Sequence, residues 1–114
     1  MEELTGVIKQ ICELEHNELV TKCAAMFDET CTPWAKDRNY NLMFLRHQET
    51  YANDKLRAKG FIFLNDVYEM LGMKKTALGQ LVGWVYKDAC SHIEFKVLGD
   101  LIIFNIDGII LDKI

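Results

Sequence analysis

IEFKVLGDLIIFNIDGIIL, residues 93–111, carries the clearest structural pattern in this chain. Its first five residues alternate apolar and charged side chains, which is typical of a strand with one buried face. Residues 99–100, Gly-Asp, have the composition of a two-residue type II′ hairpin turn, and the apolar run 101–106 predicts a central strand. Residues 107–108, Asp-Gly, predict a type I′ turn into a returning strand at 109–111. The C-terminal third therefore predicts an antiparallel β-meander.

The segment before this meander predicts short elements. Residues 61–64, Phe-Ile-Phe-Leu, indicate a short apolar strand, and residues 84–86, Trp-Val-Tyr, indicate another. Between them we expect two short helices. Asn65 is placed to cap the first, over 66–71, and Thr76 to cap the second, which ends at 81 or 82.

The first part of the chain predicts helix with one flaw. Apolar residues recur at helical spacing over residues 3–27, but a polar patch at 15–18 interrupts them. Either one long helix curves around the core, or the helix breaks and Asn17 caps a second one. We favour the continuous helix.

A loop and a second long helix follow. Pro33 disfavours helix at the residue before it, so residues 28–37 predict a loop. Residues 39–58 predict a helix, because Gly60 stands where a C-terminal cap belongs. We expect its first half, residues 40–45, to be buried, and Tyr51 and Leu56 to point inward in its second half.

Together these patterns predict an α+β fold. N-terminal helices and two short helices would pack on a C-terminal antiparallel β-meander of three to four strands. The length of 114 residues, half of them apolar, with a single proline and seven glycines, predicts a single domain over residues 1–114.

Composition narrows the functional classes. A net charge of −4 argues against broad binding to nucleic-acid backbones, which needs a basic face. The four cysteines form no CxxC pair, and we expect free thiols and a cytoplasmic protein, in a bacterial host. The acidic start is unlike a secretory signal, and the short apolar runs predict no membrane span. No cofactor is expected, because no Gly-rich phosphate loop occurs.

Three stretches resemble a known family. They are residues 51–72, YANDKLRAKGFIFLNDVYEMLG, residues 82–84, VGW, and residues 104–112, FNIDGIILD. The chain resembles, over its last two-thirds, an uncharacterised family (a domain of unknown function) of small proteins encoded by phages and prophages of Gram-positive bacteria. The resemblance implies provenance and assigns no functional residue.

Residues 66–82 carry the sharpest local motif, a helix-turn-helix pattern. In such a unit Lys74, Lys75 and Gln80 would face the DNA major groove. Tyr68 is bulky where the two helices would cross, and Gly79 would weaken the recognition helix by about 1 kcal/mol relative to Ala. We therefore favour two short helices packed on the sheet, with DNA binding as the alternative.

The sequence contains few of the residue patterns that catalytic or metal sites require. Cys90 and His92 could supply two metal ligands, but zinc sites normally show paired short spacings and only one pair is present. Ser91 is the only serine, and no nucleophile elbow surrounds it. We expect no metal site and no enzymatic activity.

The remaining hypotheses concern binding. We expect Trp34 to fold over the core, with partner binding as the alternative. Asn53 and Arg57 belong to a polar cluster that suits a helix surface or the rim of a partner groove. Our leading hypothesis is a non-enzymatic phage accessory protein that engages a host or phage macromolecule, a protein before nucleic acid, and that inhibits a host defence.

Two further expectations concern the oligomeric state and a small ligand. Apolar residues on both faces of the meander predict a homodimer that uses the C-terminal sheet face or edge. As a third functional hypothesis, an oligomeric sponge would capture a small nucleotide signal with Arg57, Asn53 and Trp84.

Overall fold

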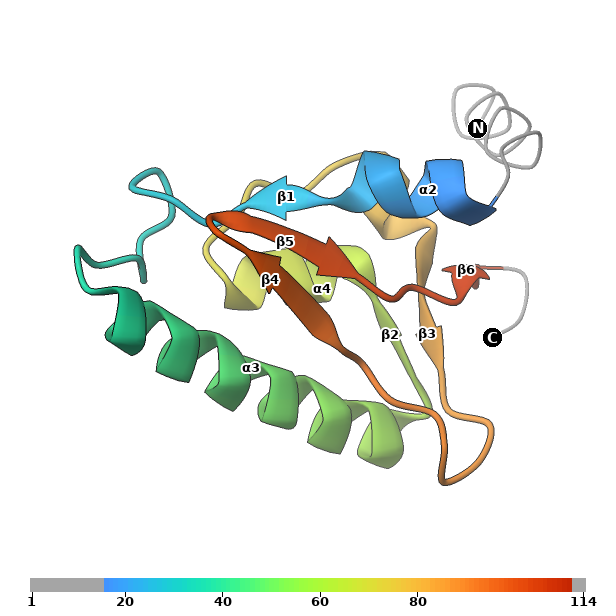
Figure 1. The fold of residues 1–114 in the computed structure, drawn as a ribbon. Helices are drawn as coiled ribbons and strands as arrows, with labels where there is room; N and C mark the ends of the chain where they lie inside the picture. The colour runs from blue at the N-terminus through green and yellow to red at the C-terminus, as the bar shows by residue number, and fades with distance from the viewer. Residues whose placement is uncertain (1–15, 112–114) are drawn as a thin grey trace.

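The structure, a computed structural model, describes residues 16–111. Its helices and strands pack as an α+β fold, as the sequence predicted (Figure 1). In chain order they are α2 (His16–Cys23), β1 (Ala25–Met26), α3 (Arg38–Lys59), β2 (Phe61–Phe63), α4 (Leu64–Met70), the 3-10 turn η1 (Leu78–Gln80), β3 (Val82–Val85), β4 (Phe95–Leu98), β5 (Leu101–Phe104) and β6 (Gly108–Ile109).

The strands form two antiparallel sheets, with strand orders β1-β5-β4 and β2-β3-β6. The hairpin β4–β5 is confirmed, and Leu98 pairs with Leu101 across it. Gly99 has a φ of +63°, and no residue other than glycine has a positive φ in the described part of the chain. This combination fits the predicted type II′ turn, because a type I′ turn would also need a positive φ at Asp100.

The predicted hairpin at residues 107–108 is wrong. β6 pairs with β3 instead of returning along β5, so the chain crosses from one sheet to the other after Phe104. Asp107 makes this crossing specific: its N–H donates to Gly83 O at 2.8 Å, and its carboxylate accepts from Val85 N at 2.9 Å. A residue predicted to turn the chain thus anchors it to the second sheet, and the strands do not form one continuous meander.

The predicted helix over residues 3–27 is also wrong at its C-terminal end. α2 ends at Cys23, and Ala25 and Met26 pair as β1 with Ile102 and Leu101 of β5. The edge of β5 offers main-chain hydrogen bonds there that helical periodicity does not reveal. Residues 3–15 of this prediction, and hence the continuity of the helix, lie outside the described residues.

Helix α3 begins and ends where the sequence predicted. The Asp37 carboxylate caps its N-terminus by accepting from Tyr40 N at 3.1 Å, and Gly60 closes its C-terminus with a φ of +91°. The predicted burial of residues 40–45 is wrong: Leu45 is buried, but Met43 is 61% exposed. Tyr51, predicted to point inward, is exposed too, because it lies on the opposite side of the helix from buried Leu56.

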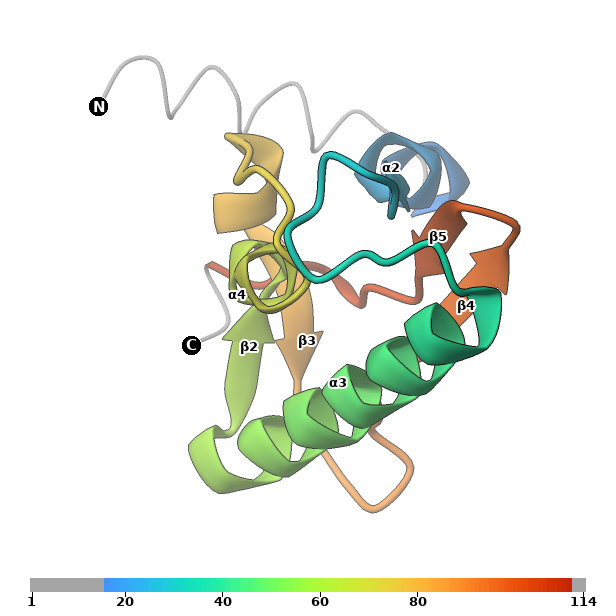
Figure 2. The ribbon, with the colours of Figure 1, turned by 90° about the vertical axis from the view of Figure 1, so that its left-hand side faces the viewer.

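The core lies between the two sheets and the helices, and Figure 2 shows α3 passing beneath both sheets. Tyr68 of α4 packs edge-on against Phe104, and its hydroxyl donates to Cys23 O at 2.7 Å. Phe63 takes the N-cap position of α4, and Asp66 in the first turn accepts from Phe63 N at 3.3 Å; Asn65, the predicted cap, lies inside the helix. Among residues 16–111, no helix has the length and hydropathy that crossing a bilayer requires.

Candidate functional site

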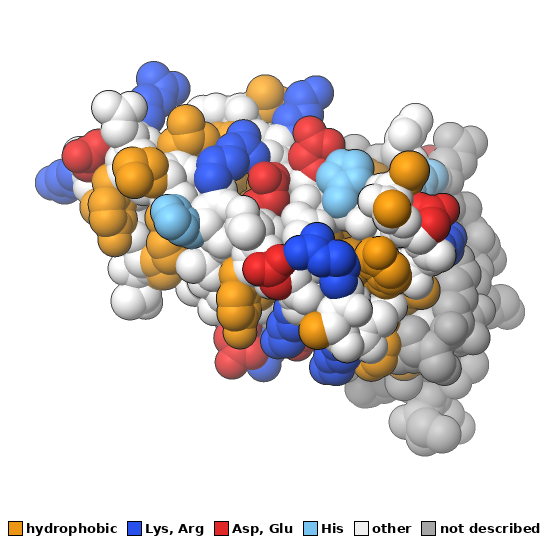
Figure 3. Space-filling model, turned by 90° about the horizontal axis from the view of Figure 1, so that it is seen from below, with side chains coloured by type: hydrophobic (Ala, Val, Ile, Leu, Met, Phe, Trp, Pro, Cys, Tyr) orange, Lys and Arg blue, Asp and Glu red, His pale blue; other side chains and the backbone are white. Residues whose placement is uncertain are grey.

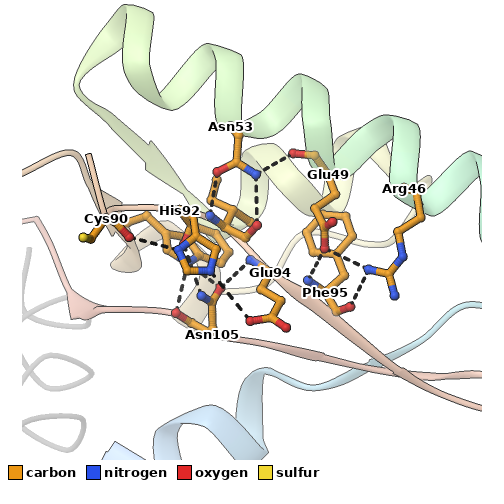
Figure 4. Close-up of polar contacts among 10 residues, drawn as sticks. Arg46, Glu49, Asn53, Cys90, His92, Glu94, Phe95 and Asn105 are labelled. Carbon is orange, nitrogen blue, oxygen red and sulfur yellow. Dashed lines mark hydrogen bonds and ion pairs between the residues drawn. The ribbon is translucent and has the colours of Figure 1, made fainter. Parts of the chain in front are cut away.

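Helix α3 lies beside the edge of β4 (Figures 1 and 4). Its side chains form hydrogen bonds with the main chain of that edge, as a neighbouring strand would. Asn53 accepts from Ile93 N at 2.7 Å and donates to Ile93 O at 2.9 Å, as a paired strand residue would. One turn earlier, Glu49 accepts from Phe95 N at 2.7 Å. Two consecutive outward-facing positions of the edge are therefore closed by the helix.

The hydrogen bonds of Asn53 and Glu49 to residues 93 and 95 form a ladder between α3 and the edge of β4. Its spacing follows from the geometry of the helix and the strand. Four residues of α-helix rise about 6 Å, and two residues of strand rise about 6.6 Å. Positions 53 and 49 of α3 therefore meet positions 93 and 95, and position 45 comes next, opposite Val97. Position 45 is Leu45, which is buried and has no polar group to offer. The ladder ends there because the sequence changes from polar to apolar.

Val97 is consequently the open position of the β4 edge. Alternate residues of an antiparallel strand point their N–H and C=O groups to the same side. Because the Phe95 groups point toward α3, the Val97 groups also point away from β5. Among the described residues, no side chain or loop backbone forms a hydrogen bond to them.

A groove of about 770 Å³ opens at this position, between the N-terminal half of α3, the loop 28–37 and the β4–β5 hairpin. Its floor is apolar and its rim is largely polar. The residues that line it include Trp34, Leu42, Leu45, Arg46, Val97 and Asp100.

The loop wall of the groove is held in place by Asn41. Its side chain donates to Ala35 O at 2.7 Å and accepts from Ala35 N at 2.9 Å, which ties the loop to the first turn of α3. This contact places Trp34, which is partly buried against the core and lines the groove. Both sequence expectations for Trp34 are compatible with this position, since one part of the indole packs on the core and another lines the groove.

Arg46 is the cation that the structure positions most firmly in the groove. Its Nη1 donates to Glu49 Oε2 and to Phe95 O, each at 3.0 Å. Figure 4 shows the other guanidinium nitrogens pointing away from these two partners. The Nε and Nη2 donors have no hydrogen-bond partner within residues 16–111. They form the side of the guanidinium that binds carboxylates in bidentate fashion.

The other residues that the sequence singled out do not gather at one site. Asn53 is committed to Ile93, and Arg57 is exposed and paired with Asp54. Trp84 is 1% exposed, and its indole N–H donates to Asn105 O and Oδ1, both at 3.0 Å. The set proposed for a nucleotide sponge is therefore wrong as a surface, because the indole is buried among core side chains.

The helix-turn-helix interpretation is wrong in its second element. After α4 the chain has no helix over residues 73–77, and η1 is a single 3-10 turn of three residues. Thr76 caps this turn as predicted, by accepting from Gly79 N at 2.9 Å. Lys74, Lys75 and Gln80 are exposed, and Lys75 Nζ lies 3.3 Å from Glu69 Oε2. No recognition helix presents these three side chains together.

Groups suited to metal binding or catalysis are dispersed in the described part of the chain. There, no three His, Cys, Asp or Glu side chains lie close enough to hold a metal ion. Burial raises the pKa of the Cys23 thiol to about 11, so the thiol stays protonated at neutral pH. His92 is exposed, and its Nδ1 lies 3.0 Å from the carbonyl oxygen of Cys90, not from its thiol.

Sequence reasoning missed Leu42, Arg46 and Val97. The sequence does carry the pattern that leaves Val97 open: polar residues at 53 and 49 and an apolar residue at 45, spaced four apart. This pattern can be interpreted only once α3 is known to lie against β4, because each of these residues by itself is ordinary for a helix surface.

Two exposed apolar surfaces lie outside the groove. Tyr40, Met43 and Tyr51 are each more than half exposed on the outer face of α3. Figure 3, which views the molecule from the side of α3, shows apolar side chains gathered toward one end of this face, among charged ones. Met26 and Leu98, each 50% exposed, flank Leu101 in one row across the β1-β5-β4 sheet.

Comparison with known proteins identifies a family without identifying an activity. Residues 6–111 match the model of a family of unknown function (DUF6353), and the chain belongs to this family. This confirms that the family is an uncharacterised one. No curated protein and no solved structure matches the chain.

Proposed function

We propose that this family member is a non-enzymatic accessory protein that acts by binding a macromolecule, with the groove beside Val97 as its binding site. The partner is a protein of the phage or of its host. The observation that carries this proposal is the combination of an apolar floor with open main-chain groups at Val97. A volume of about 770 Å³ suits a bound side chain or short segment, since ligand sites typically measure about 300–1,000 Å³.

The biological setting is part of the same proposal. The resemblance of residues 51–72 to phage and prophage proteins supports a phage origin and a place in the cytoplasm of a bacterial host. A small binding protein in that setting would act by occupying a host or phage protein, and inhibition of a host defence is the role we propose.

A peptide selection on the immobilised protein tests the groove. A displayed library of random 12-residue peptides would be selected on the wild-type protein and then measured against two neighbouring variants of α3. Leu42→Asp places a charge in the groove, because Leu42 lines it and is 44% exposed. Met43→Asp is the matched control, because Met43 is exposed on the outer face and does not line the groove.

We expect selected peptides to bind the wild-type and Met43→Asp proteins alike and to lose at least about 10-fold in affinity for Leu42→Asp, because a charge would be buried against the peptide. Loss of binding in Met43→Asp alone would move the site to the outer face of α3 and refute the groove. Failure to enrich any peptide above an uncoated support would refute the proposal as well.

The homodimer expected from the sequence remains a prediction. The row formed by Met26, Leu101 and Leu98 is the described sheet surface that fits it, because these paired residues share one face. Light scattering coupled to gel filtration, compared between the wild type and Leu98→Asp, would test it. A mass of one 13.2 kDa chain for the wild type at tens of micromolar would contradict it.

A further inference from the structure

We propose that the groove takes an extended, acidic peptide segment, which pairs its main chain with Val97 and places a carboxylate on the free side of Arg46. This inference rests on the proposed function, since it names the chemistry of the partner at the same groove. It is carried by two features of the described residues: an open strand position at Val97, and the Nε and Nη2 donors of Arg46, which have no partner there.

The open strand position favours a peptide in extended conformation. Ile93 and Phe95 receive their edge partners from α3, whereas the N–H and C=O of Val97 face the groove without one in the described part of the chain. An extended segment supplies one donor and one acceptor at such a position, as in strand addition to a sheet edge. The ladder closes the edge beyond Val97, so only one residue of the segment can pair there.

The guanidinium of Arg46 favours a carboxylate next to that pairing. Both hydrogens of its Nη1 are directed to Glu49 Oε2 and Phe95 O, which hold the side chain in one orientation. The Nε and Nη2 donors remain for a ligand, and a carboxylate can accept from both at once. Because Arg46 is already oriented, a ligand would lose little entropy in ordering it.

The groove has cationic and acidic side chains in equal number when the ion pair of Arg46 is included. Three cations line it, Lys36, Arg38 and Arg46, against the two acids Asp37 and Asp100. One oxygen of Asp37 already accepts from Tyr40 N as the helix cap. Glu49, whose Oε2 lies 3.0 Å from Arg46 Nη1, adds a third acid, so the cations and acids balance and the free side of Arg46 is the part of the groove that selects a carboxylate.

An apolar side chain on the same segment would fill the floor. Trp34 and Leu42 are accessible there, above buried Leu45. A nucleic acid would use the cations but has no main-chain partner for Val97 and no aliphatic group for this floor. The observations therefore favour a peptide in which one acidic and one large apolar residue stand at a constant spacing.

The test uses the best peptide from the 12-residue selection together with arginine variants of the full chain. Arg46→Lys keeps a cation that can still reach Glu49 but lacks the bidentate side. Arg57→Lys is the matched control, because Arg57 lies on the same helix, is exposed and is outside the groove. Affinities would be measured by titration calorimetry for the acidic peptide and for its Glu→Gln or Asp→Asn analogue.

We expect Arg46→Lys to weaken the acidic peptide about 10-fold and Arg57→Lys to weaken it less than about 2-fold, as loss of a charge-assisted bidentate contact implies. The neutral analogue should bind the wild type about 10-fold more weakly and show no further loss with Arg46→Lys. N-methylation of the peptide at the residue that pairs with Val97 should also cost about 10-fold.

Other results would overturn the inference in recognisable ways. If peptides bind and Leu42→Asp abolishes binding, but neither the acid nor Arg46 matters, the groove is a binding site and the acidic-segment inference is wrong. If a (dT)12 oligonucleotide displaces the peptide and its own binding depends on Arg46, the partner is a nucleic acid and the inference is wrong. If no peptide is enriched, both the inference and the proposed function fail.

Discussion

The two ends of the α3–β4 junction differ in how the edge of β4 is treated. Toward the C-terminal end of α3, Asn53 and Glu49 supply the hydrogen bonds that a neighbouring strand would supply to Ile93 and Phe95. Toward the N-terminal end, Leu45 takes the equivalent place, and Val97 is left facing a groove. An open edge is normally a liability because it invites pairing with other chains. Here α3 restricts that opening to one residue, which suits selective binding better than aggregation.

A pair of proline substitutions tests most strongly whether the β4 edge is paired at one position and open at the next. Lys96→Pro removes an N–H that points toward β5 and leaves its acceptor there without a donor, and we expect a loss of about 3 kcal/mol in the free energy of unfolding. Val97→Pro removes an N–H that points away from β5, and proline is tolerated at such edge positions, so we expect a loss below about 1 kcal/mol. Urea denaturation measures both. Equal losses would show that Val97 is not the open position.

Hydrogen exchange tests the same difference between Val97 and Phe95 in the unmodified protein. We expect the Val97 amide to exchange at least about 100-fold faster than the Phe95 amide, because within residues 16–111 only the Phe95 amide donates to a protein group, Glu49 Oε2. Native-state exchange followed by NMR gives the two rates side by side. Protection of Val97 equal to that of Phe95 would point to an acceptor for its N–H and contradict the open edge.

Asn53→Ala tests the end of the α3–β4 junction at which side chains of α3 pair with the strand edge. It removes the donor and the acceptor that serve Ile93, which is 1% exposed, and we expect a loss of about 2 kcal/mol in the free energy of unfolding. Arg57→Ala, one turn along the helix, is the control, and its loss should stay below about 0.5 kcal/mol because its ion pair is exposed. Similar losses in the two variants would mean that the ladder contributes little to stability.

Glu49→Gln should have the smallest effect. The amide oxygen of glutamine can still accept from Phe95 N, so only the ion pair with partly exposed Arg46 is lost, and we expect a cost below about 1 kcal/mol. Thermal unfolding would measure it, with Glu49→Ala as the variant that removes the acceptor as well. A larger loss for Gln than for Ala would contradict a ladder built on this acceptor.

Local patterns were enough for the elements whose partners are close in sequence. The hairpin at residues 99–100 and the helix between Asp37 and Gly60 depend on turn and capping residues a few positions away. They were predicted correctly for that reason. The junction of α3 with β4 depends on residues 40 to 46 positions apart, so the groove could not be predicted, although its wall residue Trp34 was selected as a candidate.

Long-range pairing also explains the errors. Asp107-Gly108 has the composition of a hairpin turn, yet Asp107 bonds to Gly83 and Val85 of the other sheet. Residues 25–26 follow a helix, yet they pair with the edge of β5 and form a strand. In both places a main-chain partner distant in sequence outcompeted the local preference, as tertiary context often does.

The amino-acid sequence was sufficient to predict the α+β class, the limits of α3 to within one residue, the β4–β5 turn and the central place of β5. These features follow from periodicity, capping and turn chemistry, which act over a few residues. The division of the strands into two sheets and the burial of Trp84 are visible only in the folded protein. The same is true of the open position at Val97, opposite Leu45. Main-chain hydrogen bonds at a strand edge and the burial of a side chain depend on which distant segment packs alongside, and a local sequence pattern does not contain that information.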